Sequence, residues 1–305
     1  MSRQPLRCWM QERVRWAVPA IGSEGCSVIA ARMQAARQAD GGFSGRAGAS
    51  DLYYSVFAAG ILRAVDDPDT IRTQPAYLAA QGDGAECDLV HLACLARLRA
   101  EAGLDDPVVT QAIAAQLHGY AYPAGGFSQT PNPDHATAYG SYLAFAAYQD
   151  LGLELPDRDG LMAAIEGCRS SDGAYANEPD QEHGLTAITA GIVALRCHCG
   201  LPIEAATRDW IMARAHRQGG FMASPLVPVP DLLSTATALT ALAHLEADLG
   251  PLTQPCLMFL DALWDSRGGF RPHAFESAVD SEYTWYGMLC LGILLGPDPE
   301  HQAPT

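Results

Sequence analysis

GGFSGRAGASDLYY, residues 41–54, contains the motif that decides the fold. Its glycine-rich start recurs along the chain, and the second glycine positions are residues 42, 84, 126, 173, 220 and 269, which gives spacings of 42, 42, 47, 47 and 49 residues. Self-similarity at a period of about 20 to 50 residues is the signature of a repeat architecture. The copies read DGGFSG, GDGAEC, AGGFSQ, SDGAYA, QGGFMA and RGGFRP. We therefore predict six copies of one structural unit.

Each copy lies between two stretches with a helical pattern. The second stretches are rich in Ala, Gly, Ser and Thr and apolar on nearly every side, which is typical of buried helices; they cover residues 51–65, 135–152, 184–200, 232–250 and 281–294. The first stretches carry more charge and are amphipathic. This pattern predicts an all-α protein, an (α/α)6 toroid in which six helix pairs form a double ring.

The toroid is expected to be a single domain over residues 1–305, with repeats starting near residues 26, 70, 107, 156, 203 and 251. An open array would need polar capping repeats at its ends. The last repeat, VDSEYTWYGMLCLGILLG, is instead among the most apolar, which favours a closed ring. Closure would bring the N-terminal ends of all six buried helices to one rim.

Composition narrows the class of partner. Apolar residues make up 49% and charged residues 18% of the 305 residues, as in a folded globular protein. The formal net charge of -16 makes nucleic acid and anionic lipid poor partners. We find no apolar run long enough for a membrane span. The nine cysteines show no paired framework and are interpreted as reduced, buried thiols, which leads us to expect a cytoplasmic protein.

The repeated GGF motif resembles that of the β subunits of protein prenyltransferases and of their relatives, the squalene and terpenoid cyclases. The resemblance extends from about Cys26 to Gly296. It implies an α/α toroid around an apolar cavity that holds an isoprenoid. In the prenyltransferases one repeat supplies an Arg and a Tyr for the diphosphate and an Asp and a Cys for zinc, and the next supplies the zinc-binding His.

The first repeat matches this prenyltransferase pattern better than the others. By resemblance, Arg46 and Tyr54 would bind the diphosphate, and Asp51 would act with Asp88-x-x-His91 of the next repeat. Tyr53, however, stands where the family has its zinc cysteine, and Ala49 lies near the place of a diphosphate-binding lysine. His183, in the fourth repeat, matches a diphosphate-contacting histidine of the family.

Asp51, Asp88 and His91 are therefore the candidate catalytic residues, and two interpretations of them remain open. Cys87 lies one helical turn before His91 and could replace the missing thiolate, so that Asp51, Cys87 and His91 would hold a catalytic zinc with one open position. Otherwise no cofactor is expected, and these residues do acid–base work.

One acidic residue per repeat lies near the predicted rim: Asp51, Asp88, Asp134, Glu182, Asp231 and Asp280. An acid at a helix start also caps free backbone N–H groups, so each of the six has a purely structural interpretation. Crowded carboxylates, however, raise one another's pKa or recruit a cation. The stretch VDDPDT, residues 65–70, has the order DDxD rather than the DxDD of class II terpenoid cyclases, and we interpret it as a helix start.

Aromatic side chains on the buried helices suit a long apolar chain or a carbocation, although core packing explains each of them singly. Tyr53, Tyr54, Tyr139, Tyr142 and Trp285 are the candidates for substrate binding, together with Arg46 and His183.

Three functions follow as hypotheses. In the first, the protein is a prenyltransferase-like enzyme that binds a prenyl diphosphate or a similar apolar substrate in a central cavity. In the second, it is a metal-free cyclase-like enzyme that protonates its substrate from a rim acid. In the third, it is a non-catalytic toroid that binds a hydrophobic ligand or a partner. An α-type subunit and a second copy of the chain both remain open as protein partners.

Overall fold

The computed structural model of the chain describes residues 4–46 and 48–297, and the side chains of all of these except residues 68–73. They form two compact units, the first composed of residues 4–7 and 73–211 and the second of residues 8–46, 48–72 and 212–297. The boundaries between the units fall inside the helices α1 (Leu6–Trp16), α4 (Pro68–Ala80) and α10 (Ala205–Met212). Each unit is built of helix pairs, as the repeats predict.

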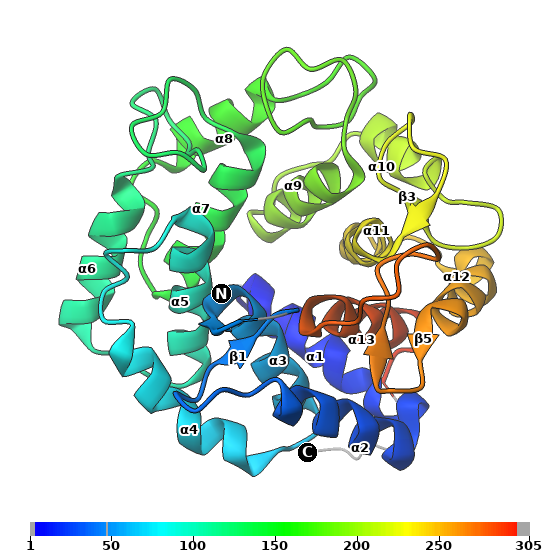
Figure 1. Cartoon of the computed structure of the whole chain (residues 1–305). Helices are drawn as coiled ribbons and strands as arrows, with labels where there is room; N and C mark the ends of the chain where they lie inside the picture. Colours follow the sequence, from blue (N-terminus) through cyan, green and yellow to red (C-terminus); the bar gives the residue numbers. More distant parts are fainter. Residues whose placement is uncertain (1–3, 47, 298–305) are drawn as a thin grey trace, which may run out of the picture. The chain divides into compact units, whose positions relative to one another are not determined.

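In the first unit, α5, α7 and α9 are the buried second helices of their repeats, and α5 packs on α7, which packs on α9 (Figure 1). Thr137 rather than Asp134 caps α7, and α9 follows Leu185 with no side-chain cap. The capping interpretation is therefore wrong for Asp134 and Glu182. Apart from α1, α4 and α10, which contain the unit boundaries, the helices of this unit are, in chain order, α5 (Leu89–Glu101), α6 (Pro107–His118), α7 (Ala138–Asp150), α8 (Arg158–Gly167) and α9 (Thr186–His198).

In the second unit, α3, α13 and α11 lie side by side as the buried helices (Figure 1). The helices of this unit are α2 (Val18–Ala35), α3 (Leu52–Ala64), α11 (Leu232–His244), α12 (Gly250–Leu263) and α13 (Ser281–Leu295). Its strands pair as three two-residue antiparallel ribbons: β1 (Phe43–Ser44) with β2 (Ser50–Asp51), β3 (Phe221–Met222) with β4 (Pro230–Asp231), and β5 (Trp264–Asp265) with β6 (Gly269–Phe270).

The GGF motif joins the two helices of a repeat through one recurrent hydrogen bond. The backbone N–H of the aromatic residue donates to a Ser or Thr hydroxyl in the first turn or two of the following buried helix. This occurs from Phe43 to Ser55, Phe127 to Ser141, Tyr175 to Thr189, Phe221 to Thr235 and Phe270 to Thr284, at 2.9, 3.0, 3.0, 2.9 and 3.4 Å. All five aromatic rings are buried. The hydroxyl thus satisfies a buried backbone donor that would otherwise cost free energy.

The pairing of strands in two of the ribbons places the aspartate before each buried helix beside the preceding glycine turn. Asp51 is paired with Phe43 across β1 and β2, and Asp231 with Phe221 across β3 and β4. In these two repeats, the loop that follows the glycine pair therefore folds back onto the glycine turn just before the buried helix begins. This local geometry brings the polar residues of the loop to the N-terminal end of the helix.

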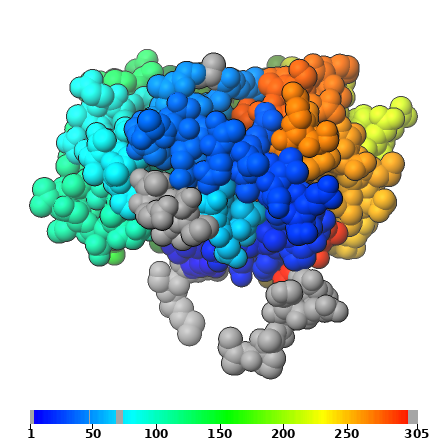
Figure 2. Space-filling view, turned by 60° about the horizontal axis from the view of Figure 1, so that its bottom comes forward, coloured from blue at the N-terminus to red at the C-terminus, as the bar shows by residue number. Residues whose placement is uncertain are grey.

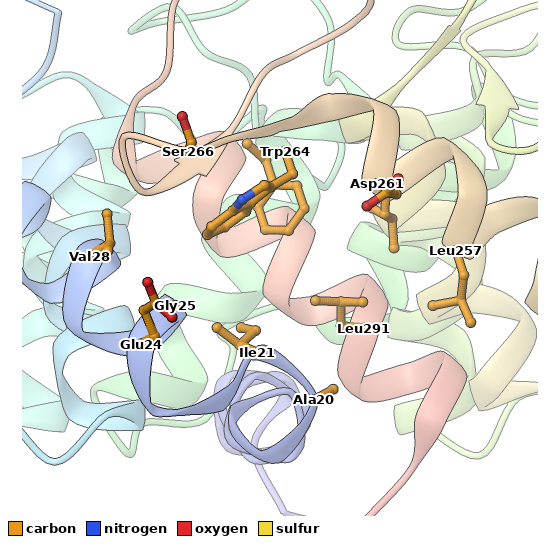
Figure 3. Close-up of a pocket in the computed structure, with 12 residues that line it drawn as sticks. Ala20, Ile21, Glu24, Gly25, Val28, Leu257, Asp261, Trp264, Ser266 and Leu291 are labelled. Carbon is orange, nitrogen blue, oxygen red and sulfur yellow. The ribbon is translucent and has the colours of Figure 1, made fainter.

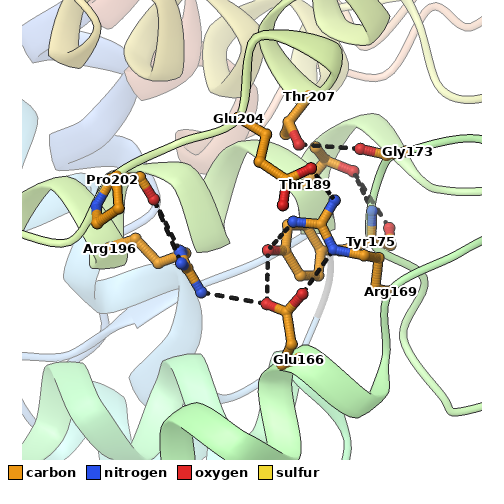
Figure 4. A network of polar contacts seen from close by, with 9 residues as sticks. All are labelled: Glu166, Arg169, Gly173, Tyr175, Thr189, Arg196, Pro202, Glu204 and Thr207. Carbon is orange, nitrogen blue, oxygen red and sulfur yellow. Dashed lines mark hydrogen bonds and ion pairs between the residues drawn. The ribbon is translucent and has the colours of Figure 1, made fainter.

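A network of ion pairs and hydrogen bonds adds to the apolar contacts of the helices around the fourth repeat (Figure 4). The Glu166 carboxylate of α8 accepts hydrogen bonds from Arg169 Nε at 2.6 Å, from the Tyr175 hydroxyl at 3.1 Å and from Arg196 Nη1 at 3.2 Å. Burial opposes ionisation of Glu166, yet these donors hold its pKa below the usual range. The network joins α8, the glycine turn and α9. Because Arg169, Tyr175 and Arg196 all donate to Glu166, we assign the network a structural role.

Three of the nine free cysteines are buried, namely Cys168, Cys256 and Cys290, whereas the other six are partly exposed. The expectation of buried thiols therefore holds for a third of them. The interpretation of residues 65–70 as a helix start is confirmed, since α4 begins at Pro68.

Candidate functional site

The three buried helices of the second unit all begin with an aspartate that caps backbone N–H groups. Asp51 Oδ1 accepts from the N–H groups of Tyr53 and Tyr54 at 2.7 and 3.2 Å. Asp231 and Asp280 accept in the same way from the N–H groups two or three residues further on. The capping interpretation is therefore confirmed for these three, and for Asp88 in the first unit.

Arg46 is engaged by two carboxylates of the last repeat. Its Nε lies 3.1 Å from Asp280 Oδ2, and its Nη1 pairs with Glu276. The Asp280 side chain is only 2% exposed, whereas that of Arg46 is 45% exposed. The guanidinium thus compensates a buried carboxylate, and any anion that it bound would have to compete with both acids.

Glu282 forms a pair with Tyr53 that the sequence reasoning missed. The Tyr53 hydroxyl donates a hydrogen bond of 2.6 Å to Glu282 Oε1. Burial raises the pKa of Glu282, and the nearby Asp280 carboxylate raises it further, against the hydrogen bond from Tyr53 and the charge of Arg46. This carboxyl group therefore holds its proton more tightly than an ordinary glutamate does.

An aromatic wall continues from this pair along α3 and α13. The Tyr53 ring packs edge-on against Phe57 with the centroids 5.1 Å apart, and Phe57 lies 5.7 Å from the rings of both Trp285 and Tyr286. Residues four apart on a helix lie on one face, so Tyr53 and Phe57 share a stripe, as do Glu282 and Tyr286. The carboxyl group thus stands at the N-terminal end of a row of aromatic rings.

Not every predicted aromatic residue is open to a ligand. The Trp285 side chain belongs to the core, because this residue is only 2% exposed. Tyr54 is partly exposed, and its pKa is raised mainly by burial. Tyr283 lies near the carboxylates of Glu282, Asp280 and Asp231, and burial together with these charges raises its pKa to about 12.

Asp231 is a second carboxyl group with an elevated pKa in the same unit. Burial raises it, while hydrogen bonds from Ser234 oppose the shift, the hydroxyl at 2.7 Å and the backbone N–H at 2.8 Å. Both Ser234 donors stabilise the ionised form and so limit the rise in the pKa of Asp231. Among the described residues, the Glu282 carboxyl group accepts a hydrogen bond from the Tyr53 hydroxyl, so its ionised form receives fewer hydrogen bonds than that of Asp231.

In the first unit, Asp88 and His91 form a pair of their own. Asp88 Oδ1 lies 2.7 Å from His91 Nδ1 and also accepts from the His91 backbone N–H at 2.9 Å. Burial raises the pKa of the Cys87 thiol, and the acids at positions 83, 86 and 88 raise it further. A thiol of this kind keeps its proton and does not resemble the ready thiolate that a zinc site needs.

The zinc prediction finds no support. Over residues 4–46 and 48–297, no group of three or more His, Cys, Asp or Glu side chains is arranged to hold a metal ion. Asp51 belongs to the second unit and Cys87 and His91 to the first. We therefore derive no step through zinc.

The other predicted binding residues also belong to the first unit. His183 Nδ1 lies 3.9 Å from Asp172 Oδ2, and the His183 side chain is partly exposed. On α7, the Tyr139 N–H donates to Asn177 Oδ1 at 3.1 Å, and the Tyr142 ring packs over Gly191 of α9. The roles of these three residues stay predictions.

A buried ion cluster at the C-terminal end of α7 has no counterpart in the sequence analysis. Asp150 Oδ1 lies 2.7 Å from Arg7 Nε, and its side chain is only 6% exposed. Arg97 Nε lies 3.0 Å from Glu101 Oε1 in the same unit. Burial, assisted by Glu101 and opposed by the two arginines, raises the pKa of Asp150 to about 7. Arg7 precedes the first repeat, so the spacing of the repeats in the sequence could not predict that it pairs with Asp150.

Asp150 should make the stability of the protein fall as the pH rises through the acid range. The folded state binds the proton of Asp150 more tightly than the unfolded chain does. Ionisation of this carboxyl group therefore does not reduce the free energy of unfolding below about pH 4, and it reduces that free energy fully above about pH 7. Relative to Asp150→Asn, the wild-type free energy of unfolding should drop by about 2 kcal/mol between pH 5 and pH 8. Urea unfolding of both proteins at each pH measures this difference.

Glu154→Gln is the matched control for that experiment, because Glu154 is an exposed acid shortly after α7. This variant reports the effect of removing an exposed acid from the same region. A difference between the wild type and Asp150→Asn that is the same at pH 5 and at pH 8 would contradict the elevated pKa of Asp150.

Comparison with known proteins shows which folds this structure resembles. Residues 201–301 match the family described as the prenyltransferase alpha-alpha toroid domain. The structure is similar to the type II terpene cyclase MstE from Scytonema, with a TM-score of 0.63 and 13% identity over 93% of this chain and 98% of that one. A search of curated proteins gave no match.

Two further structures share the fold. A protein from Actinoplanes has a TM-score of 0.57 and 16% identity, over 90% of this chain and 99% of that one. Protein geranylgeranyltransferase-I from Candida albicans, complexed with GGPP, has a TM-score of 0.52 and 14% identity, over 72% of this chain and 66% of that one. The prediction of an all-α toroid is therefore confirmed, as is the resemblance to the prenyltransferase and terpenoid cyclase superfamily. Among the described residues, no helix combines the length and the apolar character that a membrane crossing requires.

Proposed function

From the toroid fold that this chain shares with a terpene cyclase and a geranylgeranyltransferase, we propose that the protein is an enzyme that converts an isoprenoid by protonating one of its double bonds. Glu282 is the proton donor in this proposal. Its carboxyl group combines three properties: a pKa raised by burial, a single phenolic hydrogen bond, and a place at the head of an aromatic wall. The Glu282–Tyr53 pair is the observation that carries the proposal.

The chemistry follows from these contacts. The proton leaves the Glu282 carboxyl group and forms a C–H bond with the electrons of an alkene, which leaves a carbocation on the substrate and a carboxylate on the protein. The Tyr53 hydroxyl already points at this carboxylate and stabilises it without reorganisation. The partly exposed rings of Tyr53 and Tyr286 stabilise the cation, and the buried Phe57 holds these two rings in place. The proton lost from the final cation returns to the Glu282 carboxylate, directly or through water, which forms the product alkene and restores the carboxylic acid.

The charges around Glu282 favour this chemistry over the binding of a prenyl diphosphate. Asp231, Glu276 and Asp280 belong to the same unit, and Arg46 is already engaged by two of these acids. A diphosphate would bring further negative charge to a surface that holds an excess of carboxylates. A neutral alkene meets no such penalty. The prenyltransferase-like function is therefore the alternative that the experiment below has to separate.

The structural neighbours guide the choice of substrate class. A variant of the MstE cyclase has been solved with geranylgeranyl dihydroxybenzoate as its substrate, and another with merosterolic acid A as its product. We propose that this protein likewise acts on a linear polyprenyl chain without a diphosphate, carried by a small head group.

Incubation in D2O tests the proposal. The protein would be supplied with geranylgeraniol, a geranylgeranyl phenol and geranylgeranyl diphosphate, each in parallel incubations with EDTA and with added zinc and magnesium ions. The expected product is an isomer of the phenol or the alcohol that carries one deuterium at the protonated carbon. Release of diphosphate, with no deuterium in the product, would support the prenyltransferase-like alternative. No conversion of any of these substrates would leave the non-catalytic toroid as the better hypothesis.

Replacing Tyr53 by phenylalanine should move the basic limb of the pH–rate profile to higher pH. The enzyme needs protonated Glu282, so the rate falls as the pH rises through the pKa of this group. The hydrogen bond from Tyr53 lowers that pKa, and its removal raises it. The maximal rate should also fall about tenfold, because the carboxylate left after proton transfer loses its donor.

Tyr54→Phe serves as the control for Tyr53→Phe, since Tyr54 is the neighbouring tyrosine of the same helix. Its pH limb should coincide with that of the wild type. Coincident limbs for all three proteins would show that Tyr53 does not tune the proton donor.

A further inference from the structure

A pocket of about 510 Å³ opens in the second unit between α2, α12 and α13 (Figure 3). Figure 2 shows one face of this unit, on which the blue atoms of the N-terminal segment border the orange atoms of the segment near residue 260. Small-molecule sites typically enclose about 300 to 1,000 Å³. The apolar side chains that line the pocket are Ala20, Ile21, Val28, Leu257, Leu260 and Leu291.

The pocket wall on α2 is shaped by a break in that helix. Gly22 has a φ of 73° and a ψ of 169°, which interrupts the helical backbone inside the lining segment. Gly25 follows on the same wall and contributes no side chain. A straight helix with larger residues at these two positions would present a different and fuller surface.

Trp264 supplies the aromatic surface of the pocket. Its ring lies 5.2 Å from that of Phe270 at an angle of 69°. Phe270 is only 3% exposed, so it supports Trp264 from behind, and the partly exposed Trp264 is the ring that a ligand would meet. The face of an indole attracts cations more strongly than that of any other side chain.

Two carboxylates flank this ring from opposite walls, Glu24 from α2 and Asp261 from α12 (Figure 3). Within the part of the chain that the structure describes, neither carboxylate has a hydrogen-bond or ion-pair partner. The nearest arginine in sequence, Arg267, is engaged by Asp265 through contacts of 2.8 and 2.9 Å. Both acids are exposed and, among the described residues, neither forms an ion pair, so the pocket presents two free carboxylates.

This pocket is separate from the Glu282 site. Leu291 lies nine residues beyond Glu282 on α13, which corresponds to roughly 13 Å along the helix axis. Phe270 reaches the first turn of α13 through its hydrogen bond to Thr284, but the pocket lining contains neither Glu282 nor a residue of the aromatic wall.

We propose that this pocket is a second ligand site, which binds an organic cation with an apolar body, such as an alkyl- or arylalkyl-ammonium ion. The ammonium group lies over Trp264 between Glu24 and Asp261, and the apolar body contacts the leucine and isoleucine side chains of the walls. The net charge of -16 raises the local concentration of such cations. The proposal does not depend on the activity assigned to Glu282.

A matched pair of probes tests the charge requirement. 4-Phenylbutylamine is a cation at neutral pH, and 4-phenylbutanol has nearly the same size without the charge. Calorimetric titration should show the amine binding at least tenfold more tightly than the alcohol. The preference should disappear in the double variant Glu24→Gln/Asp261→Asn. It should persist in the control Asp66→Asn/Glu246→Gln, which removes two exposed acids of the same unit outside the pocket.

NMR locates the site. The chain has five tryptophans, and the indole N–H resonance of Trp264 is assigned by its loss in Trp264→Phe. The amine should shift this resonance more than the other four. Equal binding of amine and alcohol, an unchanged preference in Glu24→Gln/Asp261→Asn, or a shift confined to the other tryptophans would each overturn the proposal.

Discussion

Replacing Glu282 by glutamine should lower turnover about 10³-fold, with the fold and its thermal stability preserved. Glutamine has nearly the same size and still accepts the hydrogen bond from Tyr53, but it has no proton to give to an alkene. Positioned general acids contribute roughly 10² to 10⁴ in rate, which sets the expected magnitude. Deuterium incorporation from D2O, followed by mass spectrometry of the product, measures the proton transfer directly.

Glu276→Gln is the matched control for Glu282→Gln. Both residues lie in the last repeat of the second unit, but Glu276 pairs with Arg46 and does not touch the aromatic wall. Its turnover should stay within about threefold of the wild type, because exposed ion pairs contribute little. Full activity of Glu282→Gln would assign proton donation to another acid, with Asp231 as the next candidate because burial raises its pKa too.

Replacing Gly292 by alanine should destabilise the second unit by about 3 kcal/mol. A Cβ atom at this position would overlap the backbone carbonyl oxygen of Arg13, so α13 and α1 could keep their packing only by moving apart. Overpacking of this kind typically costs about 1 to 3 kcal/mol, and backbone atoms yield less readily than a side chain does. The midpoint of urea unfolding is the measurement.

Gly191→Ala provides the comparison, because Gly191 is also inside a buried helix. There a Cβ atom would meet only the Tyr142 ring, at 3.6 Å, which is an ordinary van der Waals contact. Alanine favours the helix by about 0.5 to 1 kcal/mol over glycine, so this variant should be as stable as the wild type or slightly more stable. Equal stability of Gly292→Ala and Gly191→Ala would mean that the close approach of α1 and α13 contributes nothing.

Much of the fold could be predicted from the repeat alone. The predicted range 51–65 contains α3, and the range 281–294 corresponds to α13 within one residue. Small and apolar residues on every side of these helices can be accommodated only in a buried position, and glycines mark each turn, so local pattern and packing agree. The N-terminal helix α1 lies outside the repeats and was not predicted, because no periodic copy identifies it.

The candidate site was predictable only in part, and for a physical reason. Arg46, Asp51, Tyr53 and Tyr54 could be selected from one continuous stretch, since the loop and the helix start that hold them are local in sequence. Their partners Asp280 and Glu282 come from more than 220 residues away, as the separations of 234 and 229 residues in their hydrogen bonds show. The sequence does offer one usable signal, an acid at the second position of a helix followed four residues later by a tyrosine.

The sequence by itself determined that the chain is a six-fold helical repeat, because periodic glycines and all-round apolar helices leave few other ways to bury the apolar surface. Only the tertiary structure decided which acid has the properties of a proton donor. A carboxyl group acquires its pKa from burial and from neighbours that the chain brings together over long distances. Tyr53 shows the difference: in the sequence it stands where a zinc-binding cysteine was expected, and in the structure it is the hydrogen-bond donor to Glu282.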